Sequence, residues 1–154
     1  MLAEGDRAPG FTLESDSGEP VSLDQFRGRK VVLYFYPKDG TSGCTTEACE
    51  FRDHWKAVQE TGAVVLGVSP DNVASHRRFK AKHRLPFPLL ADPDHRVAEA
   101  YGAWGEKRLY GRRYHGILRT TYLIDREGHI ARVFTKVKPR GHASQVLAAL
   151  RDMA

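Results

Sequence analysis

Apolar residues in this chain form short runs that alternate with longer segments of mixed polar and apolar character. Two runs rich in β-branched and aromatic residues, 31–36 and 63–68, predict buried strands. Residues 121–124 and 130–134 predict two more strands, and the polar, glycine-containing turn 125–128 between them favours an antiparallel hairpin. The pattern therefore predicts at least four strands, all of them after residue 30.

Helices are expected between and after these strands. Their ends are marked by turn and capping signals, such as Ser69-Pro70-Asp71-Asn72 before one helix and Gly102 after another. A further small hairpin, built from residues 11–13 and 21–22, is expected before the first strand. The expected helices cover residues 45–60, 72–83, 94–101 and 142–151.

The order of these elements predicts an α/β, thioredoxin-like fold, with a central mixed β-sheet flanked by helices on both faces. Two parallel crossover strands come first, and an antiparallel hairpin and a final helix follow. A length of 154 residues is that of one domain, spanning 1–154, with a sizeable core. Chemistry in such sheets tends to lie beyond the carboxyl end of a strand, which directs attention to the segment after Tyr36.

The composition is typical of a globular domain without a membrane span. Hydrophobic residues make up 41% and charged residues 28%, close to the averages for globular domains. No apolar run reaches the 18 residues of a membrane span, so no membrane partner is expected. Residues 1–6 lack the basic and apolar pattern of a signal peptide, and a cytoplasmic location is the expectation.

The formal net charge is +5, which raises the question of an anionic partner. No nucleic-acid-binding motif accompanies the basic residues, so a solvated basic surface is favoured and no nucleic-acid partner is expected. A basic nucleic-acid-binding module remains the alternative from another functional class. The basic residues are Arg77, Arg78, Lys80, Lys82, Arg84, Lys107, Arg108, Arg112, Arg113, Lys136, Lys138 and Arg140.

The chain has two cysteines, Cys44 and Cys49. In a reducing cytosol such a pair is more often catalytic or metal-binding than a static disulfide. A zinc site is disfavoured because the nearest histidine, His54, lacks the close ligand spacing of zinc motifs. Both cysteines could also be small buried hydrophobic residues, an interpretation that is stronger for Cys49.

Cys44 stands where a Pro- and Gly-rich loop leads into a predicted helix. The unpaired amides and the positive dipole end of a helix N-terminus favour a thiolate, which is the nucleophilic form of cysteine. Cys49 lies more than one turn further along, where this effect has faded. Position alone therefore distinguishes an attacking cysteine from its partner.

The segment 37–49, with Pro37-x-x-x-Thr41-x-x-Cys44 at its start, resembles the active-site motif of the peroxiredoxins. Together with the following Phe51-Arg52-Asp53 it is similar to the bacterioferritin-comigratory, or peroxiredoxin Q, subfamily. Further blocks at 5–11, 101–107 and 116–125 resemble that subfamily in the same order. Ser42 departs from the proline usual there. Because serine can cap a helix, we expect altered loop stiffness and retained activity.

The resemblance implies a role for each of five residues. Cys44 matches the peroxidatic cysteine and Cys49 the resolving cysteine. Thr41 matches the hydroxyl that hydrogen-bonds the peroxide and the sulfur, Arg119 matches the active-site arginine, and Pro37 matches the residue that shields the pocket from water. On residue chemistry alone, Arg119 could be a surface residue, Thr41 a loop residue that bonds its own backbone, and Pro37 a turn former.

The resemblance further implies a thioredoxin-dependent peroxidase of the atypical two-cysteine type, acting in antioxidant defence. It would reduce hydrogen peroxide and organic hydroperoxides through an intramolecular Cys44–Cys49 disulfide, recycled by thioredoxin or a similar dithiol. It implies a monomer with no cofactor and no metal. A thioredoxin-like disulfide oxidoreductase is the closest rival, although such enzymes use C-x-x-C and this chain has C-x₄-C.

Three other features complete the expectations. Glu47 shares a helix face with Cys44 and either holds Arg119 in place or simply favours the helix N-terminus. His76 and His83 are expected on one solvated helix face. Core packing is favoured over a position near the site for three aromatic residues, Trp104, Tyr110 and Tyr114.

Overall fold

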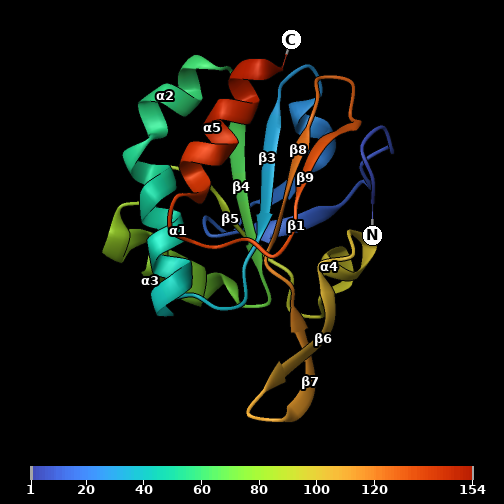
Figure 1. Cartoon of the computed structure of the whole chain (residues 1–154). Coiled ribbons are helices and arrows are strands. Elements are labelled where there is room, and N and C mark those ends of the chain that lie inside the picture. Colours follow the sequence, from blue (N-terminus) through green and yellow to red (C-terminus); the bar gives the residue numbers. More distant parts are fainter. Residues whose placement is uncertain (1, 154) are drawn as a thin grey trace.

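The computed structural model describes residues 2–153 and is built around a seven-stranded mixed sheet. The strand order is β2-β1-β5-β4-β3-β8-β9, in which β3, β4 and β5 run parallel to one another and β8 runs antiparallel to β3 (Figure 1). The strands are β1 (Thr12–Ser15), β2 (Pro20–Ser22), β3 (Val31–Phe35), β4 (Val64–Ser69), β5 (Leu89–Ala91), β8 (Thr120–Ile124) and β9 (Ile130–Phe134).

Helices cover both faces of this sheet, as the element order predicted. One face packs against α1 (Ser42–Asp53), α2 (Trp55–Glu60), α3 (Val73–His83) and α5 (His142–Asp152), and the other against α4 (Arg96–Ala100) and the short 3-10 helix η1 (Leu23–Phe26). None of the helices within residues 2–153 is both long enough and apolar enough to cross a bilayer.

Strand β3 lies at the centre and is buried on both faces. Its side chains alternate, with Val32 and Tyr34 in the core beneath α1 and α5, and Leu33 and Phe35 in the core beneath α4. A strand that buries both faces needs a continuous apolar run, which explains why 31–36 reads as uninterrupted hydrophobic sequence. Its carboxyl end leads directly into the loop before α1.

The predicted helix over 45–60 is wrong in its bounds, because the structure has two helices that break at His54. Helix α1 also begins earlier, at Ser42, with Thr41 as its N-cap in an extended conformation. The expectation that Ser42 caps the helix is therefore wrong. Ser42 is already helical, and its carbonyl accepts a hydrogen bond from Thr46 Oγ1 at 3.1 Å.

Three strands were not predicted. Strand β5 has only three residues, too few for a periodic signal. Strands β6 (Trp104–Leu109) and β7 (Arg112–Ile117) form a separate hairpin that projects from the body of the protein (Figure 1). Because most of its residues are solvent-exposed on both faces, it shows no alternation of apolar and polar residues.

The hairpin also corrects the expectation for two of the three aromatic residues, Tyr110 and Tyr114, whereas Trp104 packs against the core. Tyr110 is 97% exposed at the two-residue turn, where it and Gly111 both have positive φ, as a type I′ turn requires. Tyr114 is 44% exposed, so core packing is wrong for both tyrosines. Trp104 is partly buried and stacks on His95 at the base of the hairpin, with ring centroids 3.7 Å apart.

Candidate functional site

Cys44 is the third residue of α1 and lies just beyond the carboxyl end of β3. It is 1% exposed. The first intrahelical bond runs from the Thr45 amide to the Thr41 carbonyl, so the Cys44 amide belongs to the unpaired first turn. The sulfur therefore lies at the positive end of the helix dipole, as the sequence predicted, and this position favours a thiolate.

Arg119 reaches Cys44 from the far end of the chain. Strand β8 pairs antiparallel with β3 so that Thr120 lies opposite Phe35, which brings the residue before β8 beside the segment that follows β3. Arg119 Nη2 donates to Cys44 Sγ at 3.2 Å, across a separation of 75 residues in sequence. The guanidinium thus supplies a fixed positive charge at the sulfur.

Glu47 holds the other side of the same guanidinium. Its Oε1 accepts from Arg119 Nη1 at 2.6 Å, so of the two roles considered for Glu47 the structure supports the contact with Arg119. Burial raises the pKa of Glu47 to about 7, although the positive charge of Arg119 opposes the shift. Its second oxygen, Oε2, is buried and lacks a hydrogen-bond partner among the described residues.

Gly43 is a part of the site that sequence reasoning did not single out. A Cβ atom at this position would lie 3.4 Å from Arg119 Nη2 and 3.2 Å from the Pro139 ring. The absence of a side chain therefore lets the guanidinium and Pro139 approach the start of α1. The small residue next to Cys44 was the available signal, but its partner Pro139 is far away in sequence.

Lys107, from β6, also lies close enough to affect the charge of the site. Burial and the positive charge of Arg119 lower its pKa, and the negative charge of Cys44 acts in the opposite direction. The projecting hairpin therefore brings a second cation to the neighbourhood of the sulfur. Nothing in the local sequence of Lys107 indicates this position, since it depends on how the hairpin leaves the sheet.

The structure places Thr41 and Pro37 in the loop that connects β3 to α1. The Thr41 hydroxyl donates to the Lys38 carbonyl at 2.9 Å and is exposed. Among the described residues, no hydrogen bond joins it to Cys44. Pro37 is half-buried, two residues after the end of β3. Both residues therefore lie on the loop that leads to Cys44, within seven positions of it.

Cys49 is half-buried on the same helix, and both thiols are free. In a regular helix, residues five apart have Cα atoms about 8.6 Å apart and side chains about 140° apart around the axis. A disulfide requires a Cα separation of about 4.4–6.8 Å. The two cysteines therefore cannot bond while α1 is intact.

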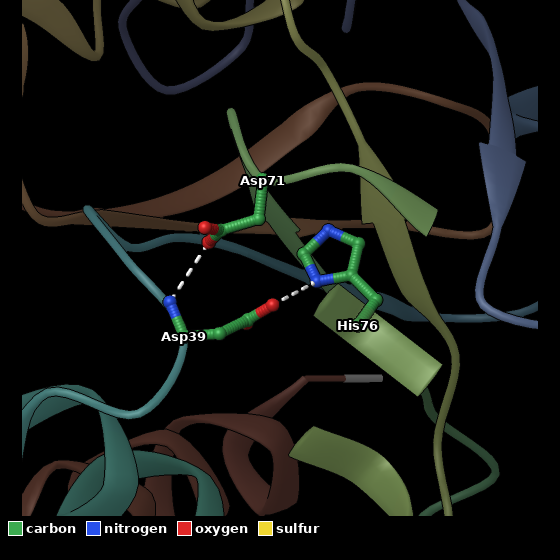
Figure 2. Close-up of side chains that lie close together, drawn as sticks. All are labelled: Asp39, Asp71 and His76. Atoms are coloured by element: carbon green, nitrogen blue, oxygen red, sulfur yellow. Dashed lines mark hydrogen bonds and ion pairs between the residues drawn. The ribbon is translucent and has the colours of Figure 1, made fainter. Parts of the chain in front are cut away.

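His76 was expected on a solvated face, and this is wrong because its side chain is fully buried. It packs against Asp39 from the loop before α1, and Asp71 lies close by (Figure 2). Ligand atoms of these three side chains lie within 4.8 Å of one another, a spacing that a metal site could use. However, both ring nitrogens of His76 are already engaged, by Asp39 and by the Leu90 carbonyl.

The chain resembles known proteins along nearly its full length. The model of the AhpC/TSA family matches residues 4–133. A putative peroxiredoxin bcp of Coxiella burnetii is 53% identical over 146 residues, covering 95% of this chain and 97% of the relative. Peroxiredoxin Bcp of Bacillus subtilis is 49% identical over 150 residues, covering 97% of this chain and 96% of the relative.

The fold is shared as well. The bacterioferritin comigratory protein of Xanthomonas campestris superposes with a TM-score of 0.88 at 41% identity, covering 92% of this chain and 90% of that protein. This similarity confirms the predicted thioredoxin-like α/β fold. The sequence relatives, the shared fold and the buried cysteine beside an arginine lead to one conclusion. The chain belongs to the AhpC/TSA family and is a peroxiredoxin of the Bcp, or peroxiredoxin Q, subfamily, a thiol peroxidase.

Proposed function

We propose that this peroxiredoxin reduces hydrogen peroxide and organic hydroperoxides with Cys44 as the attacking thiol. The observation that supports this assignment most directly is the 3.2 Å contact between Cys44 Sγ and Arg119 Nη2 at the N-terminus of α1. A helix N-terminus and a guanidinium both favour the thiolate. The Xanthomonas campestris relative, studied for alkyl peroxide reduction, supports organic hydroperoxides as part of the substrate class.

In the first step the Cys44 thiolate attacks the terminal peroxide oxygen. A sulfur–oxygen bond forms and the oxygen–oxygen bond breaks, which leaves a sulfenic acid on Cys44 and a hydroxide or alkoxide that takes up a proton to become water or an alcohol. Arg119 stabilises the negative charge as it moves from sulfur to the departing oxygen. The guanidinium does so without titrating, and Glu47 holds it in place.

Thr41 and Pro37 lie in the loop before α1 and have different roles. Thr41 contacts the peroxide, and Pro37 limits the access of water. Because the Thr41 hydroxyl donates its hydrogen to the Lys38 carbonyl, its lone pairs remain free to accept the peroxide hydrogen. This arrangement would orient the peroxide for attack by the sulfur. Pro37 shields the pocket from water, since it has no backbone N–H to hydrate and is half-buried at the strand end.

The second step uses Cys49. Its thiol attacks the sulfenic sulfur of Cys44, which forms a disulfide and releases water. A dithiol such as thioredoxin then reduces the disulfide and is itself oxidised, so the cycle needs no metal and no organic cofactor. A dithiol reductant that recycles the disulfide requires a reducing compartment, and we place the protein in the cytoplasm as a one-domain monomer spanning 1–154.

Peroxide consumption with a thioredoxin system tests this function. We expect the chain to turn over hydrogen peroxide, an alkyl hydroperoxide or a lipid hydroperoxide, whereas Cys44→Ser should abolish turnover because serine is a far weaker nucleophile. Cys49→Ser should consume about one peroxide per chain and then stop. Normal turnover by a folded Cys44→Ser variant would overturn the assignment, and disulfide exchange without peroxide consumption would favour the oxidoreductase alternative.

A further inference from the structure

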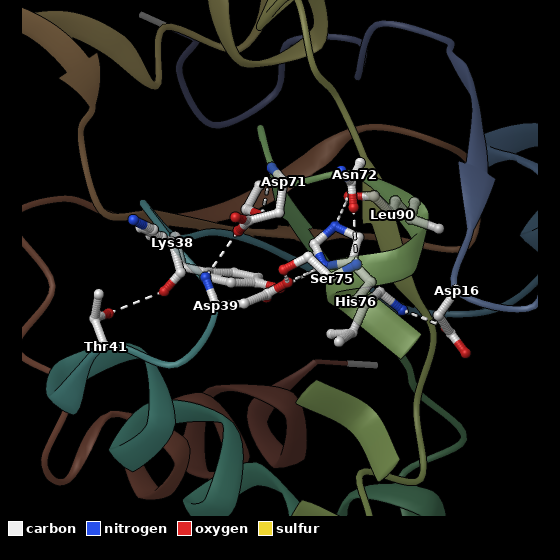
Figure 3. A network of polar contacts seen from close by, with 12 residues as sticks. Asp16, Lys38, Asp39, Thr41, Asp71, Asn72, Ser75, His76 and Leu90 are labelled. Atoms are coloured by element: carbon white, nitrogen blue, oxygen red, sulfur yellow. Dashed lines mark hydrogen bonds and ion pairs between the residues drawn. The ribbon is translucent and has the colours of Figure 1, made fainter. Parts of the chain in front are cut away.

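A buried polar network lies beside the site and takes no part in the cycle described above. Asp39 is its centre (Figure 3). One carboxylate oxygen accepts from the Tyr36 hydroxyl at 2.6 Å, and the other accepts from Ser75 Oγ at 2.9 Å and pairs with His76 Nδ1 at 2.7 Å. His76 comes from α3, whereas Asp39 belongs to the loop that leads to Cys44. The network therefore joins the active-site loop, residues 37–41, to a helix on the same face of the sheet.

Both ring nitrogens of His76 face hydrogen-bond acceptors. Nδ1 faces the Asp39 carboxylate, and Nε2 faces the Leu90 carbonyl at 2.9 Å. Both partners are acceptors, so both bonds form when both ring nitrogens carry hydrogen. The His76 and Asp39 side chains that make this contact are 0% and 5% exposed.

A buried polar contact of this kind is weak evidence for stability. Removing polar side chains from water costs free energy, and apolar residues of similar size often serve a core equally well. What the pair provides is directional bonding, which fixes the geometry of its members. The role of this contact is therefore to fix the position of the loop that carries Asp39.

The other end of the network is equally well fixed. The Asp39 amide donates to Asp71 Oδ2 at 2.8 Å (Figure 2). Ser69 Oγ donates to the same oxygen at 2.6 Å. Asn72 caps α3 by accepting from the Ser75 amide at 2.8 Å. Backbone and side chain of Asp39 are thus both tied to the end of β4 and the start of α3. The Thr41 hydroxyl, two residues later, is tied to Lys38 within the same loop.

We propose that His76 and Asp39 are positioning residues for the peroxidase reaction. They anchor the active-site loop so that Thr41 stays at the distance from Cys44 that orients a peroxide. The inference rests on the proposed function, because it assigns a purpose to the position of Thr41. The anchor also marks a boundary: when α1 unwinds to form the disulfide, the chain up to Asp39 stays in place and the rearrangement begins after it.

The variant Asp39→Asn tests the anchor because it keeps the shape and removes the charge. Asp16→Asn is the matched control. Asp16 is also a buried carboxylate, 6% exposed, which accepts from the Leu89 amide at 2.9 Å and pairs with Lys80 at 3.0 Å, without touching the active-site loop. His76→Gln removes the imidazole on the opposite side of the contact and serves if Asp39→Asn does not fold.

Two reaction rates of Cys44 distinguish a loss of loop positioning from a general loss of structure. Single-turnover reaction with hydrogen peroxide depends on the loop, whereas alkylation by iodoacetamide depends on the thiolate alone. We expect Asp39→Asn to slow the peroxide reaction by about ten-fold or more while alkylation stays within about two-fold. Asp16→Asn should leave both rates within about two-fold, even where its melting temperature falls. Equal slowing of both reactions by Asp39→Asn, or unchanged peroxide reactivity, would overturn the proposal.

Hydrogen exchange measures how firmly the active-site loop is held, and it needs no peroxide. In the reduced wild-type chain the amide of residue 39 should be protected, and in Asp39→Asn the protection of 39–41 should fall, with no such change in Asp16→Asn. In the oxidised wild-type chain, protection at residue 39 should persist while residues 44–51 exchange faster. A wild-type chain that does not react with peroxide would overturn the proposed function, whereas unchanged exchange at 39–41 in Asp39→Asn would overturn the anchor itself.

Discussion

Arg119 donates through Nη1 to Glu47 and through Nη2 to Cys44, so one guanidinium links a buried carboxyl group to the Cys44 sulfur. Its side chain is only 15% exposed. At this level of burial, charge interactions are weakly screened by solvent and are stronger than those of a surface pair. The reactivity of Cys44 should therefore depend on this single residue more than on any exposed cation nearby.

Arg119→Met keeps the length of the side chain and removes its charge. We expect Cys44 to react with peroxide about ten-fold more slowly or worse, since one lost charge interaction is worth about 1.4 kcal/mol or more. The alkylation rate of the variant should rise only at higher pH than in the wild type. Arg27→Met, which removes an exposed arginine paired with Asp24, is the control. A pH profile of alkylation that matches the wild type would show that Arg119 does not stabilise the Cys44 thiolate.

Glu47 makes the stability of the protein depend on pH. Burial raises its pKa from 4.5 in the unfolded reference to about 7, so the folded state binds more protons between these values. Its contribution to stability is therefore fully present below pH 4.5 and is lost as the pH rises through 7. The loss amounts to about 3 kcal/mol at most.

Glu47→Gln should remove this dependence. Urea unfolding at pH 5 and pH 8 should show a larger fall in free energy of unfolding for the wild type than for the variant, by on the order of 2 kcal/mol. Glu60→Gln, an exposed position on α2, should behave as the wild type does. The same pH dependence in Glu47→Gln and wild type would show that the carboxyl group titrates normally in the folded state.

At the scale of elements, α1 has to serve two incompatible states. As a helix it presents Cys44 at its positive end, but it also keeps Cys49 about 8.6 Å away in Cα separation and on another side of the axis. The disulfide requires at least local unwinding of this helix, so resolution has to wait for such an opening. While resolution waits, the sulfenic acid on Cys44 is open to further oxidation to sulfinic acid.

We predict that oxidation unwinds the segment from about residue 41 to residue 51. Amides of residues 44–51 should exchange faster in the oxidised than in the reduced protein, whereas those of α5 should not change. Cys49→Ser, which cannot form the disulfide, should retain protection and accumulate sulfinic acid more readily under excess peroxide. Equal protection of 44–51 in both states, with the Cys44–Cys49 disulfide established by mass spectrometry, would contradict the unwinding.

At the scale of the whole molecule, the exposed large hydrophobic residues among those described lie on the β6–β7 hairpin: Leu109, Tyr110 and Tyr114. Basic residues flank them, including Arg108, Arg112 and Arg113. Two copies that met through this hairpin would bring like charges together, on a chain whose net charge is already +5. This arrangement disfavours self-association through the most apolar exposed region.

We therefore predict a monomer. Light scattering coupled to size-exclusion chromatography should give the mass of one chain at micromolar concentration and moderate salt. The measurement should be repeated at higher salt, which screens the repulsion between the hairpins. A weak association through the hairpin would appear first under that condition. A stable dimer at low micromolar concentration under both conditions would contradict the prediction.

The sequence alone determined the features that depend on local pattern. The continuous apolar runs 31–36 and 63–68 predicted strands buried on both faces, because only such strands need no polar alternation. The loop and helix start around Cys44 predicted that this residue lies at a helix N-terminus, because helix ends follow from nearby residues. These signals also carried the family resemblance, which the comparisons confirm.

Only the tertiary structure decided the features that join distant parts of the chain. Cys44 and Arg119 are 75 residues apart and meet because β3 and β8 pair in one register. The burial of His76 is set by Asp39, 37 residues earlier, and cannot be read from its own basic helix. Strand β5 and the β6–β7 hairpin lack a periodic signal because one is very short and the other is mostly exposed. Such contacts depend on which elements pack together, and local propensity and periodicity contain no information about that choice.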